Sequence, residues 1–212
     1  MISGEIFGPV GNTRYSEYAT DILRSGRHLL DIINSVLDLS RSEAGKLTLQ
    51  EESVDLRYVL RDCARMLGDF CKTAGLELSS SEPPEPTFVA GEKAKLRQIF
   101  LNLLSNAIKF SKPGGKVYVR VIADGPDVAI LEIEDHGIGM TEAEQERALQ
   151  PFGQAKPATT RNYGGTGLGL PITKGLVEAH GGTLTINSRA GCGTIVRIVL
   201  PRERKRLEFT SF

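Results

Sequence analysis

The feature that most constrains this sequence is a run of four glycines within six residues, in the segment Tyr163–Leu170. Glycine tolerates positive φ and lets the backbone approach a ligand closely. A helical pattern follows from Pro171, and a helix that begins at a glycine loop presents N–H groups and a positive dipole end to an anion. Taken alone, the run fits a phosphate-binding loop and a plain glycine-rich turn equally well. It has neither the Lys-Ser/Thr of a P-loop nor the spacing of a dinucleotide fingerprint.

Composition and charge give no support for binding to nucleic acid or for insertion into a membrane. The 212 residues carry 26 basic and 26 acidic side chains, so net charge gives no argument for binding nucleic acid or an anionic membrane. No apolar run is long enough to span a bilayer, and the N-terminus has no signal-peptide pattern. Cys63, Cys71 and Cys192 form no CxxC pair, and we expect all three to be buried thiols in a reducing cytoplasm.

Residues 12–44 are predicted to form one long helix. Its residues at alternating spacings of three and four form a heptad seam: Tyr15, Tyr18, Ile22, Ser25, Leu29, Ile32, Val36 and Leu39. Ile33 and Leu37 widen this stripe, as in a helix of a bundle. Such a helix can pack on its own domain or against a partner, and the length of the stripe favours the partner.

Strand and helix patterns alternate downstream, ending in a charged tail at 202–212. Period-two patterns predict strands at 46–50, 76–80, 87–90, 117–123, 128–135, 183–188 and 194–200. Helical patterns span 55–74, 93–110 and the segment from Pro171, and a capping box at Thr141–Glu144 starts a short helix. The irregular segment 150–166 is long enough to indicate a lid or binding loop.

One face of the predicted helix 93–110 carries Gln98, Asn102, Asn106 and Lys109. Asparagine is unfavourable inside a helix, because its side chain competes for backbone hydrogen bonds. Two asparagines four residues apart in an apolar helix therefore call for an explanation. Amide oxygens can bind Mg²⁺, and Lys109 one turn further on suits a phosphate.

A carboxylate stands at the end of a predicted apolar strand, at Asp135, and Gly137 and Gly139 follow it. A buried aspartate facing a pocket can accept hydrogen bonds from an amino group such as that of adenine. Helix-face amides, a strand-ending aspartate and a glycine loop each have an ordinary structural explanation. Their occurrence together, in this order, favours a nucleotide site.

These segments resemble the motifs of sensor histidine kinases. Glu92–Phe110 resembles the N box, Asp135–Met140 the first glycine box, and Pro151–Gln154 the F box. Gly165–Leu170 resembles the second glycine box, and Gly191–Thr194 the last box near the adenine. Five motifs in order make this resemblance specific.

The resemblance also implies a fold and a division into parts. Upstream residues 7–46 are similar to the second helix of a dimerisation and phosphoacceptor hairpin, in details that resemble the cell-cycle sensor kinases of alphaproteobacteria. The implied fold is α/β (α+β), a two-layer sandwich preceded by a long bundle helix. Its mixed, mostly antiparallel sheet has three helices on one face. The implied parts are an incomplete hairpin helix at 1–45, an ATP-binding catalytic domain at 46–201 and a charged tail at 202–212.

The resemblance further implies ATP and Mg²⁺ as ligands. Asn106 would hold the metal with Asn102 beside it, and Lys109 would contact phosphate. Asp135 would read the adenine amino group, and Arg161 in the lid would reach the γ-phosphate. The remaining implied ATP-binding residues are Gly137, Ile138, Gly139, Phe152, Gly165, Thr166, Gly167, Leu168, Gly169 and Thr194.

The chain departs from the family pattern at two points. His136 stands where the family usually has threonine, beside the adenine contact. In the family's phosphoacceptor motif an acidic residue follows the histidine and a proline lies three further on, and none of His28, His136 and His180 has this context. We expect a fragment that lacks the acceptor helix or a degenerate homologue. In either case the chain alone should not phosphorylate itself.

Three functions from different classes are compatible with these residues. The leading hypothesis is the catalytic domain of a two-component sensor histidine kinase, which presents Mg·ATP to a histidine outside this chain for onward transfer to a response-regulator aspartate. The family implies a homodimer through the helical hairpin in the full-length protein and a cytoplasmic location, which is compatible with a membrane anchor elsewhere in the full-length protein. We expect no contact of this segment with nucleic acid or a membrane. The alternative is a nucleotide-dependent scaffold, a pseudokinase that acts through helix 12–44. An ATP-hydrolysing relative of the mismatch-repair, gyrase or chaperone type ranks last, because those use a glutamate where this chain has Asn102, and an amide cannot be a general base.

Overall fold

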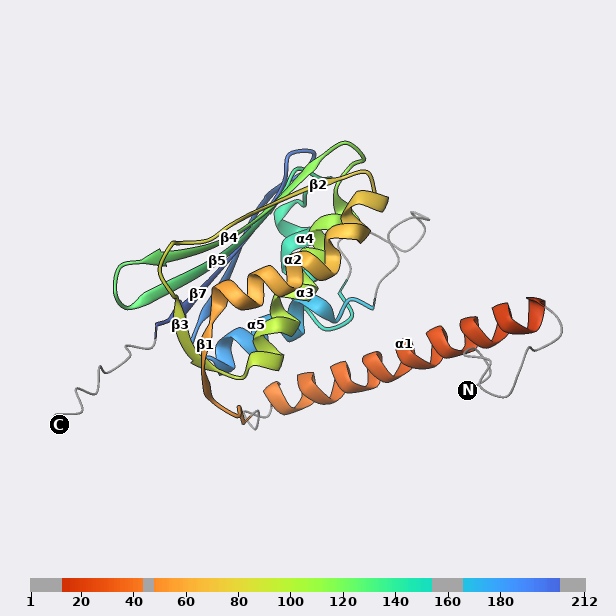
Figure 1. Ribbon diagram of the computed structural model, residues 1–212, viewed down its shortest axis with the longest axis horizontal. Coiled ribbons are helices and arrows are strands. Elements are labelled where there is room, and N and C mark those ends of the chain that lie inside the picture. Colours follow the sequence, from red (N-terminus) through yellow and green to blue (C-terminus); the bar gives the residue numbers. More distant parts are fainter. Residues whose placement is uncertain (1–12, 44–47, 154–165, 203–212) are drawn as a thin grey trace.

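The computed structural model describes residues 13–43, 48–153 and 166–202. A long helix comes first, and an α+β domain follows it (Figure 1). The helices are α1 (Thr13–Glu43), α2 (Leu56–Thr73), α3 (Lys93–Phe110), α4 (Glu142–Ala148) and α5 (Gly169–Ala179). The strands are β1 (Glu52–Asp55), β2 (Glu77–Ser81), β3 (Phe88–Gly91), β4 (Lys116–Asp124), β5 (Val128–Asp135), β6 (Thr183–Arg189) and β7 (Gly193–Pro201).

Five strands form the main sheet, in the order β2-β4-β5-β7-β6. The β2–β4 pair is parallel and the other pairs are antiparallel. A separate antiparallel ribbon joins β1 to β3. Helices α2, α3 and α5 cover one face of the main sheet (Figure 1). The predicted two-layer sandwich with a mixed, mostly antiparallel sheet is confirmed.

The core lies between the three helices and the inner face of the sheet. Alternation along β4 shows this arrangement, since Val117, Val119 and Val121 are buried whereas Tyr118 and Arg120 are partly exposed on the other face. The largest fully buried side chains are Leu56, Leu60, Leu96, Ile99, Phe100, Leu104, Leu131, Ile133, Leu168, Leu176, Ile198 and Leu200. Burial of these apolar side chains is the main favourable contribution to folding.

Ion pairs across the strands hold the outer face of the sheet. Arg120 Nη1 lies 2.8 Å from the carboxylates of both Glu132 and Glu134. Arg197 Nη2 lies 2.9 Å from Glu132 Oε2. Burial by itself would raise the pKa of Glu132, but the hydrogen bonds from Arg197 and Arg120 outweigh it and hold that pKa below its usual range.

The start of α2 is fixed by a buried cap, and aspartate is among the residues that favour this position in sequence. Asp55 Oδ1 accepts hydrogen bonds from the backbone N–H groups of Arg57 and Thr87, both at 3.1 Å. Its other oxygen lies 2.9 Å from Arg57 Nη2. Burial would raise the pKa of Asp55, but the Arg57 side chain and the two N–H groups together lower it.

This cap explains one wrong prediction. Residues 48–50, within the strand predicted at 46–50, are not in a strand, and the first strand is β1 at Glu52–Asp55. Asp55 both pairs with Phe88 in the ribbon and caps α2, so the contact with the β3 segment sets the position of the strand. Local alternation does not reveal this partner.

The cysteines were predicted correctly at two of three positions. Cys63 and Cys71 are buried on the inner side of α2, and burial raises the pKa of Cys63 to about 11. Cys192 is exposed, so its predicted burial is wrong. It lies in the turn between β6 and β7, flanked by Gly191 and Gly193.

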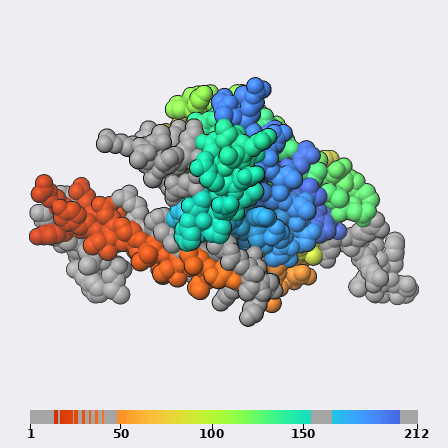
Figure 2. Space-filling view, turned by 180° about the vertical axis from the view of Figure 1, so that it is seen from behind, coloured from red at the N-terminus to blue at the C-terminus, as the bar shows by residue number. Residues whose placement is uncertain are grey.

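Helix α1 packs against α5 and projects beyond the domain, as Figure 1 and Figure 2 show from opposite sides. The seam residues whose side chains are described are exposed, and these include Tyr15, Tyr18, Ile22, Leu29 and Val36. The described part of this chain therefore leaves that stripe uncovered. None of the described helices combines the length and apolar character needed to cross a membrane.

A buried histidine joins the end of α5 to the start of α3. His180 Nδ1 lies 2.7 Å from the Leu176 carbonyl oxygen, which can only accept, so Nδ1 carries the proton. His180 Nε2 then accepts from the Glu92 N–H at 3.3 Å. A Cβ on Gly91 would overlap the imidazole ring, so this position requires glycine.

Replacement of Gly91 by alanine tests this contact. Gly91→Ala should lower the free energy of unfolding by about 1–3 kcal/mol, the usual cost of overpacking, in urea denaturation. Gly68→Ala in α2 is the matched control, because a Cβ there meets nothing within 4 Å. The control should gain up to about 1 kcal/mol, since alanine favours a helix. His180→Ala should relieve part of the destabilisation caused by Gly91→Ala, which a double-mutant cycle would measure as a favourable coupling energy. Equal effects of Gly91→Ala and Gly68→Ala on stability would contradict the packing.

Candidate functional site

Helix α3 contacts both regions in which the other predicted nucleotide residues lie: the start of α5, through Asn102 and Asn106, and the loop after β5, through Phe110. Asn102 Nδ2 lies 3.5 Å from the Gly169 carbonyl oxygen and 3.4 Å from Thr173 Oγ1. Asn106 faces the same turn, because a Cβ on Gly169 would lie 3.8 Å from Asn106 Nδ2. The two asparagines of α3 are thus placed against the end of the glycine run.

Lys109 lies one turn further along α3 and is partly buried. Burial lowers the pKa of Lys109. Its Nζ lies 5.0 Å from the centroid of the Phe110 ring, in a cation–π arrangement. A partly desolvated ammonium group interacts more strongly with an anion than a fully hydrated one.

Asp135 is buried at the end of β5. Its Oδ1 accepts a hydrogen bond from the Gly137 N–H at 2.8 Å. Burial raises the pKa of Asp135, and the N–H groups of Gly137 and Thr194 offset this only in part. A buried carboxylate with a raised pKa is a common sign of a functional site.

The loop after Asp135 is held by close backbone contacts. Ile138 donates its N–H to the Phe110 carbonyl oxygen at 3.2 Å, and its own carbonyl accepts from Gly191 at 2.7 Å. A Cβ on Gly137 would overlap the Phe110 carbonyl oxygen. Gly139 has φ of 58°, and a Cβ there would overlap the Arg189 carbonyl. These glycines let the loop bridge the end of α3 and the turn that joins β6 to β7.

Ser188 organises the same region, and none of the sequence motifs includes it. Its Oγ accepts from the Met140 N–H at 2.8 Å and lies 2.9 Å from the Gly193 carbonyl oxygen. It also lies 2.8 Å from Thr194 Oγ1, the last predicted ATP-binding residue. The one signal in the sequence was the place of Ser188 at the end of a strand beside the last motif.

The residues on either side of segment 154–165 pack together. Phe152 has φ of 60°, which is unusual for a residue other than glycine, and its ring is exposed. A Cβ on Gly167 would lie 2.7 Å from the Phe152 carbonyl carbon. The Leu168 N–H donates to Thr166 Oγ1 at 3.3 Å, and Leu168 itself is buried at the start of α5. Arg161, Gly165 and most of the predicted lid lie outside the described residues.

His136 does not join this cluster. Its ring meets the Tyr118 ring edge to face at 5.8 Å, and Nε2 lies 3.3 Å from Glu134 Oε1. Tyr118 and Glu134 belong to the outer face of the sheet, so His136 lies beside the predicted adenine contact rather than at it. His180 lies at the opposite end of α5 from Gly169.

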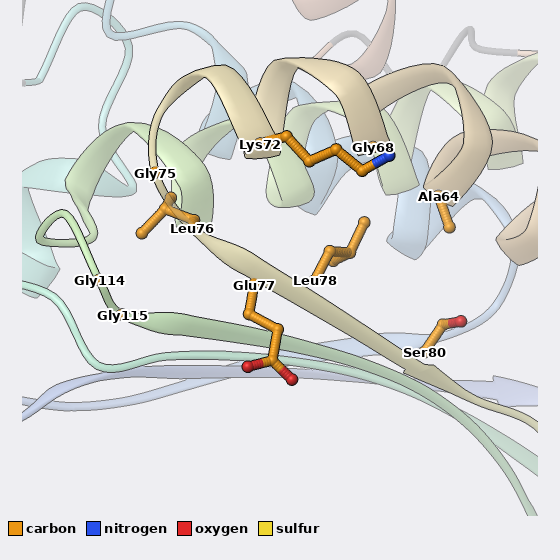
Figure 3. A pocket seen from close by; sticks show the side chains of 10 residues that line it. All are labelled: Ala64, Gly68, Lys72, Gly75, Leu76, Glu77, Leu78, Ser80, Gly114 and Gly115. Carbon is orange, nitrogen blue, oxygen red and sulfur yellow. The ribbon is translucent and has the colours of Figure 1, made fainter.

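A pocket of about 550 Å³ opens elsewhere, between α2 and the edge strand β2 (Figure 3). Small residues such as Ala64 and Gly68 line it, and no predicted site residue does. The charged groups at its rim have partners outside it: Lys72 with Asp69 at 3.6 Å, and Glu77 with a lysine of β4 at 2.8 Å. This pocket lacks the convergent polar groups of a nucleotide site.

The donor set of the candidate site fits Mg²⁺ and a nucleotide. Within residues 13–43, 48–153 and 166–202, no group of three or more His, Cys, Asp and Glu side chains could hold a metal ion. Mg²⁺ commonly keeps several waters and takes one or two protein oxygens with substrate phosphates, which the amide oxygens of α3 could supply. The first turn of α5 and Lys109 suit phosphate, and Asp135 suits a base amino group.

Comparison with known proteins places these features in a family. Residues 91–204 match the family described as histidine kinase-, DNA gyrase B- and HSP90-like ATPase. The chain is 38% identical over 212 residues to the cell-division control histidine kinase PdhS of Brucella suis, covering 96% of this chain and 20% of that protein. It is 41% identical over 204 residues to the non-motile and phage-resistance protein of Caulobacter vibrioides, covering 95% and 24%. The chain thus spans about a quarter or less of the length of these relatives.

A solved structure shows the same fold. Full-length ShkA in complex with AMPPNP superposes with a TM-score of 0.75 at 28% identity. The similarity covers 88% of this chain and 38% of that one.

The buried charge of Asp135 predicts a stability penalty. The pKa of Asp135 is raised on folding, so the folded state binds this proton more tightly than the unfolded state does. The resulting contribution to stability is complete below the unfolded pKa and is lost as the pH rises through the folded pKa. Asp135→Asn should therefore raise the Tm of the ligand-free protein at about pH 7. The gain should shrink as the pH falls below the unfolded pKa of about 3.9, because both states are then largely protonated. Asp124→Asn, at the exposed last residue of β4, should leave Tm unchanged, and a lower Tm for Asp135→Asn at neutral pH would refute the penalty.

Proposed function

This chain belongs to the histidine kinase-, DNA gyrase B- and HSP90-like ATPase family, and we propose that it is the ATP-binding catalytic domain of a two-component sensor histidine kinase. Residues 46–201 present Mg·ATP for phosphoryl transfer to a histidine outside this chain. The observation that carries the proposal is the contact of Asn102 and Asn106 with the first turn of α5, on a helix whose end contacts the loop after the buried Asp135. The name of the Brucella suis relative, a histidine kinase, and the AMPPNP in the ShkA complex support it.

Each residue has a proposed role. Asn106 holds Mg²⁺ through its amide oxygen, with Asn102 beside it. Lys109 contacts phosphate, and Asp135 accepts a hydrogen bond from the adenine amino group. When bound, Mg²⁺ neutralises charge that develops on the phosphate oxygens. The loop Gly137–Gly139, Thr194 and the segment Thr166–Gly169 enclose the nucleotide, together with Phe152, Gly165 and the Arg161 side chain as a partner for the γ-phosphate.

Hydrolysis by this domain is disfavoured by Asn102. Its amide cannot take a proton from water, and its NH₂ group donates to oxygens of α5. The scaffold alternative is also less favoured, because Asn102 and Asn106 contact the start of α5 and the end of the same helix α3 contacts the loop after Asp135. A domain that only bound partners through α1 would not need this arrangement.

The exposed stripe of α1 supports a proposed dimer. We propose that residues 1–45 supply one helix of a helical hairpin and that a second copy helps to cover the stripe from Tyr15 to Val36. Residues 202–212 form a charged tail. A response regulator accepts the phosphoryl group after the histidine.

Binding of nucleotide tests the proposed site. Isothermal titration with AMPPNP should show affinity that rises with Mg²⁺, and Asn106→Ala should reduce the Mg²⁺-dependent part by about tenfold or more, equivalent to about 1.4 kcal/mol. Ser105→Ala is the matched control, since Ser105 is the preceding residue of α3 and is exposed. Equal Mg²⁺ dependence in Asn106→Ala and wild type would contradict the metal assignment.

Incubation with γ-labelled ATP tests the missing acceptor. Phosphoryl transfer needs an acceptor nitrogen held in line with the γ-phosphate, so we expect no acid-labile label on this chain alone. Both ring nitrogens of His180 are already hydrogen-bonded, and His136 lies on the outer face of the sheet. Acid-labile label that disappears in His28→Ala would overturn this expectation and make His28 the acceptor.

A further inference from the structure

We propose that Thr173 is a positioning residue, whose buried hydroxyl orients the Asn102 amide so that its oxygen, and not its NH₂ group, is available to a metal ion. The inference rests on the proposed Mg·ATP site and assigns a role to a residue that no sequence motif includes. Asparagine can present either end of its amide after a rotation of about 180°, and only the oxygen binds a cation. A site that uses Asn102 therefore needs something to select the orientation.

The hydrogen bonds of Thr173 make that selection. Thr173 lies one turn after Gly169 in α5 and is fully buried, and its Oγ1 lies 2.8 Å from the Gly169 carbonyl oxygen. A carbonyl oxygen can only accept, so the single hydroxyl proton of Thr173 points to Gly169. Thr173 Oγ1 can therefore act only as a hydrogen-bond acceptor towards Asn102.

Asn102 consequently meets two acceptors on its α5 side. Its Nδ2 lies 3.4 Å from Thr173 Oγ1 and 3.5 Å from the Gly169 carbonyl oxygen. The opposite orientation would place Oδ1 against the same two oxygens with no proton between them, which is repulsive. The NH₂ group therefore stays on α5, and Oδ1 is the atom of the amide that turns away from these two oxygens.

A purely structural role does not account for the hydroxyl. Bonding from threonine to the carbonyl four residues earlier is common in helices and slightly destabilises them. The neighbours of Thr173 on α5 that are buried with it, Ile172, Leu176 and Val177, are apolar. Valine would fill the same space without burying a polar group, so the contact with Asn102 is what distinguishes threonine here.

Two substitutions at one position test the role. Thr173→Val keeps the shape and removes the hydroxyl, whereas Thr173→Ser keeps the hydroxyl. In titrations with AMPPNP, Thr173→Val should reduce the gain in affinity on adding Mg²⁺ by about three- to tenfold and leave the Mg²⁺-free affinity unchanged. Thr173→Ser should behave as wild type. An unchanged Mg²⁺ gain in a folded Thr173→Val protein would overturn the inference and leave the proposed function standing.

A measurement on the nucleotide-free wild-type protein separates the two proposals. The Asn102 side-chain NH₂ signals, assigned by their loss in Asn102→Asp, should show nuclear Overhauser contacts to the Thr173 side chain. Their absence would refute the orientation even if Thr173→Val failed to fold. If the wild-type protein shows these contacts but binds AMPPNP without any dependence on Mg²⁺, the proposed function is wrong. The metal-related role of Thr173 is then wrong as well.

Discussion

The packing of α3 against α5 is the constraint on which the site depends. The two helices run antiparallel and are joined by polar contacts at both ends of α5. His180 binds the backbone of Glu92 at one end, and Asn102 donates to Gly169 and Thr173 at the other. The apolar side chains between these contacts supply most of the stabilisation, and the polar contacts set the register of one helix on the other. The asparagine face of α3 thereby faces the end of the glycine run.

A second constraint is the close approach of backbone around the loop after β5. Gly137 and Gly139 lie where any side chain would overlap a carbonyl of α3 or of the β6–β7 hairpin. The loop therefore brings Asp135 to the edge of the site at the cost of burying its charge. Binding a base amino group would compensate for part of that cost, which is the usual trade between stability and function at a site.

Much of the fold could be predicted from the sequence, because the signals are local. Helical spacing put Asn102, Asn106 and Lys109 on one face of α3, and that face exists in the structure. The cap at Asp55 and the capping box at Thr141 and Glu144 form as predicted, since each involves residues only a few positions apart. Within the described residues, the ordered motifs also indicated correctly which segments lie near one another.

The sequence by itself determined the elements, the faces of the helices and the family. Only the tertiary structure decided which distant groups pair. The first strand lies at β1 rather than at 46–50, because Asp55 needs the β3 segment as its partner. The roles of Ser188, Thr173 and His180 could not be found from spacing, since the hydrogen bonds that tie them to other elements join residues between 48 and 88 positions apart. Such contacts depend on how helices and strands pack against one another, and a local sequence pattern does not specify that packing.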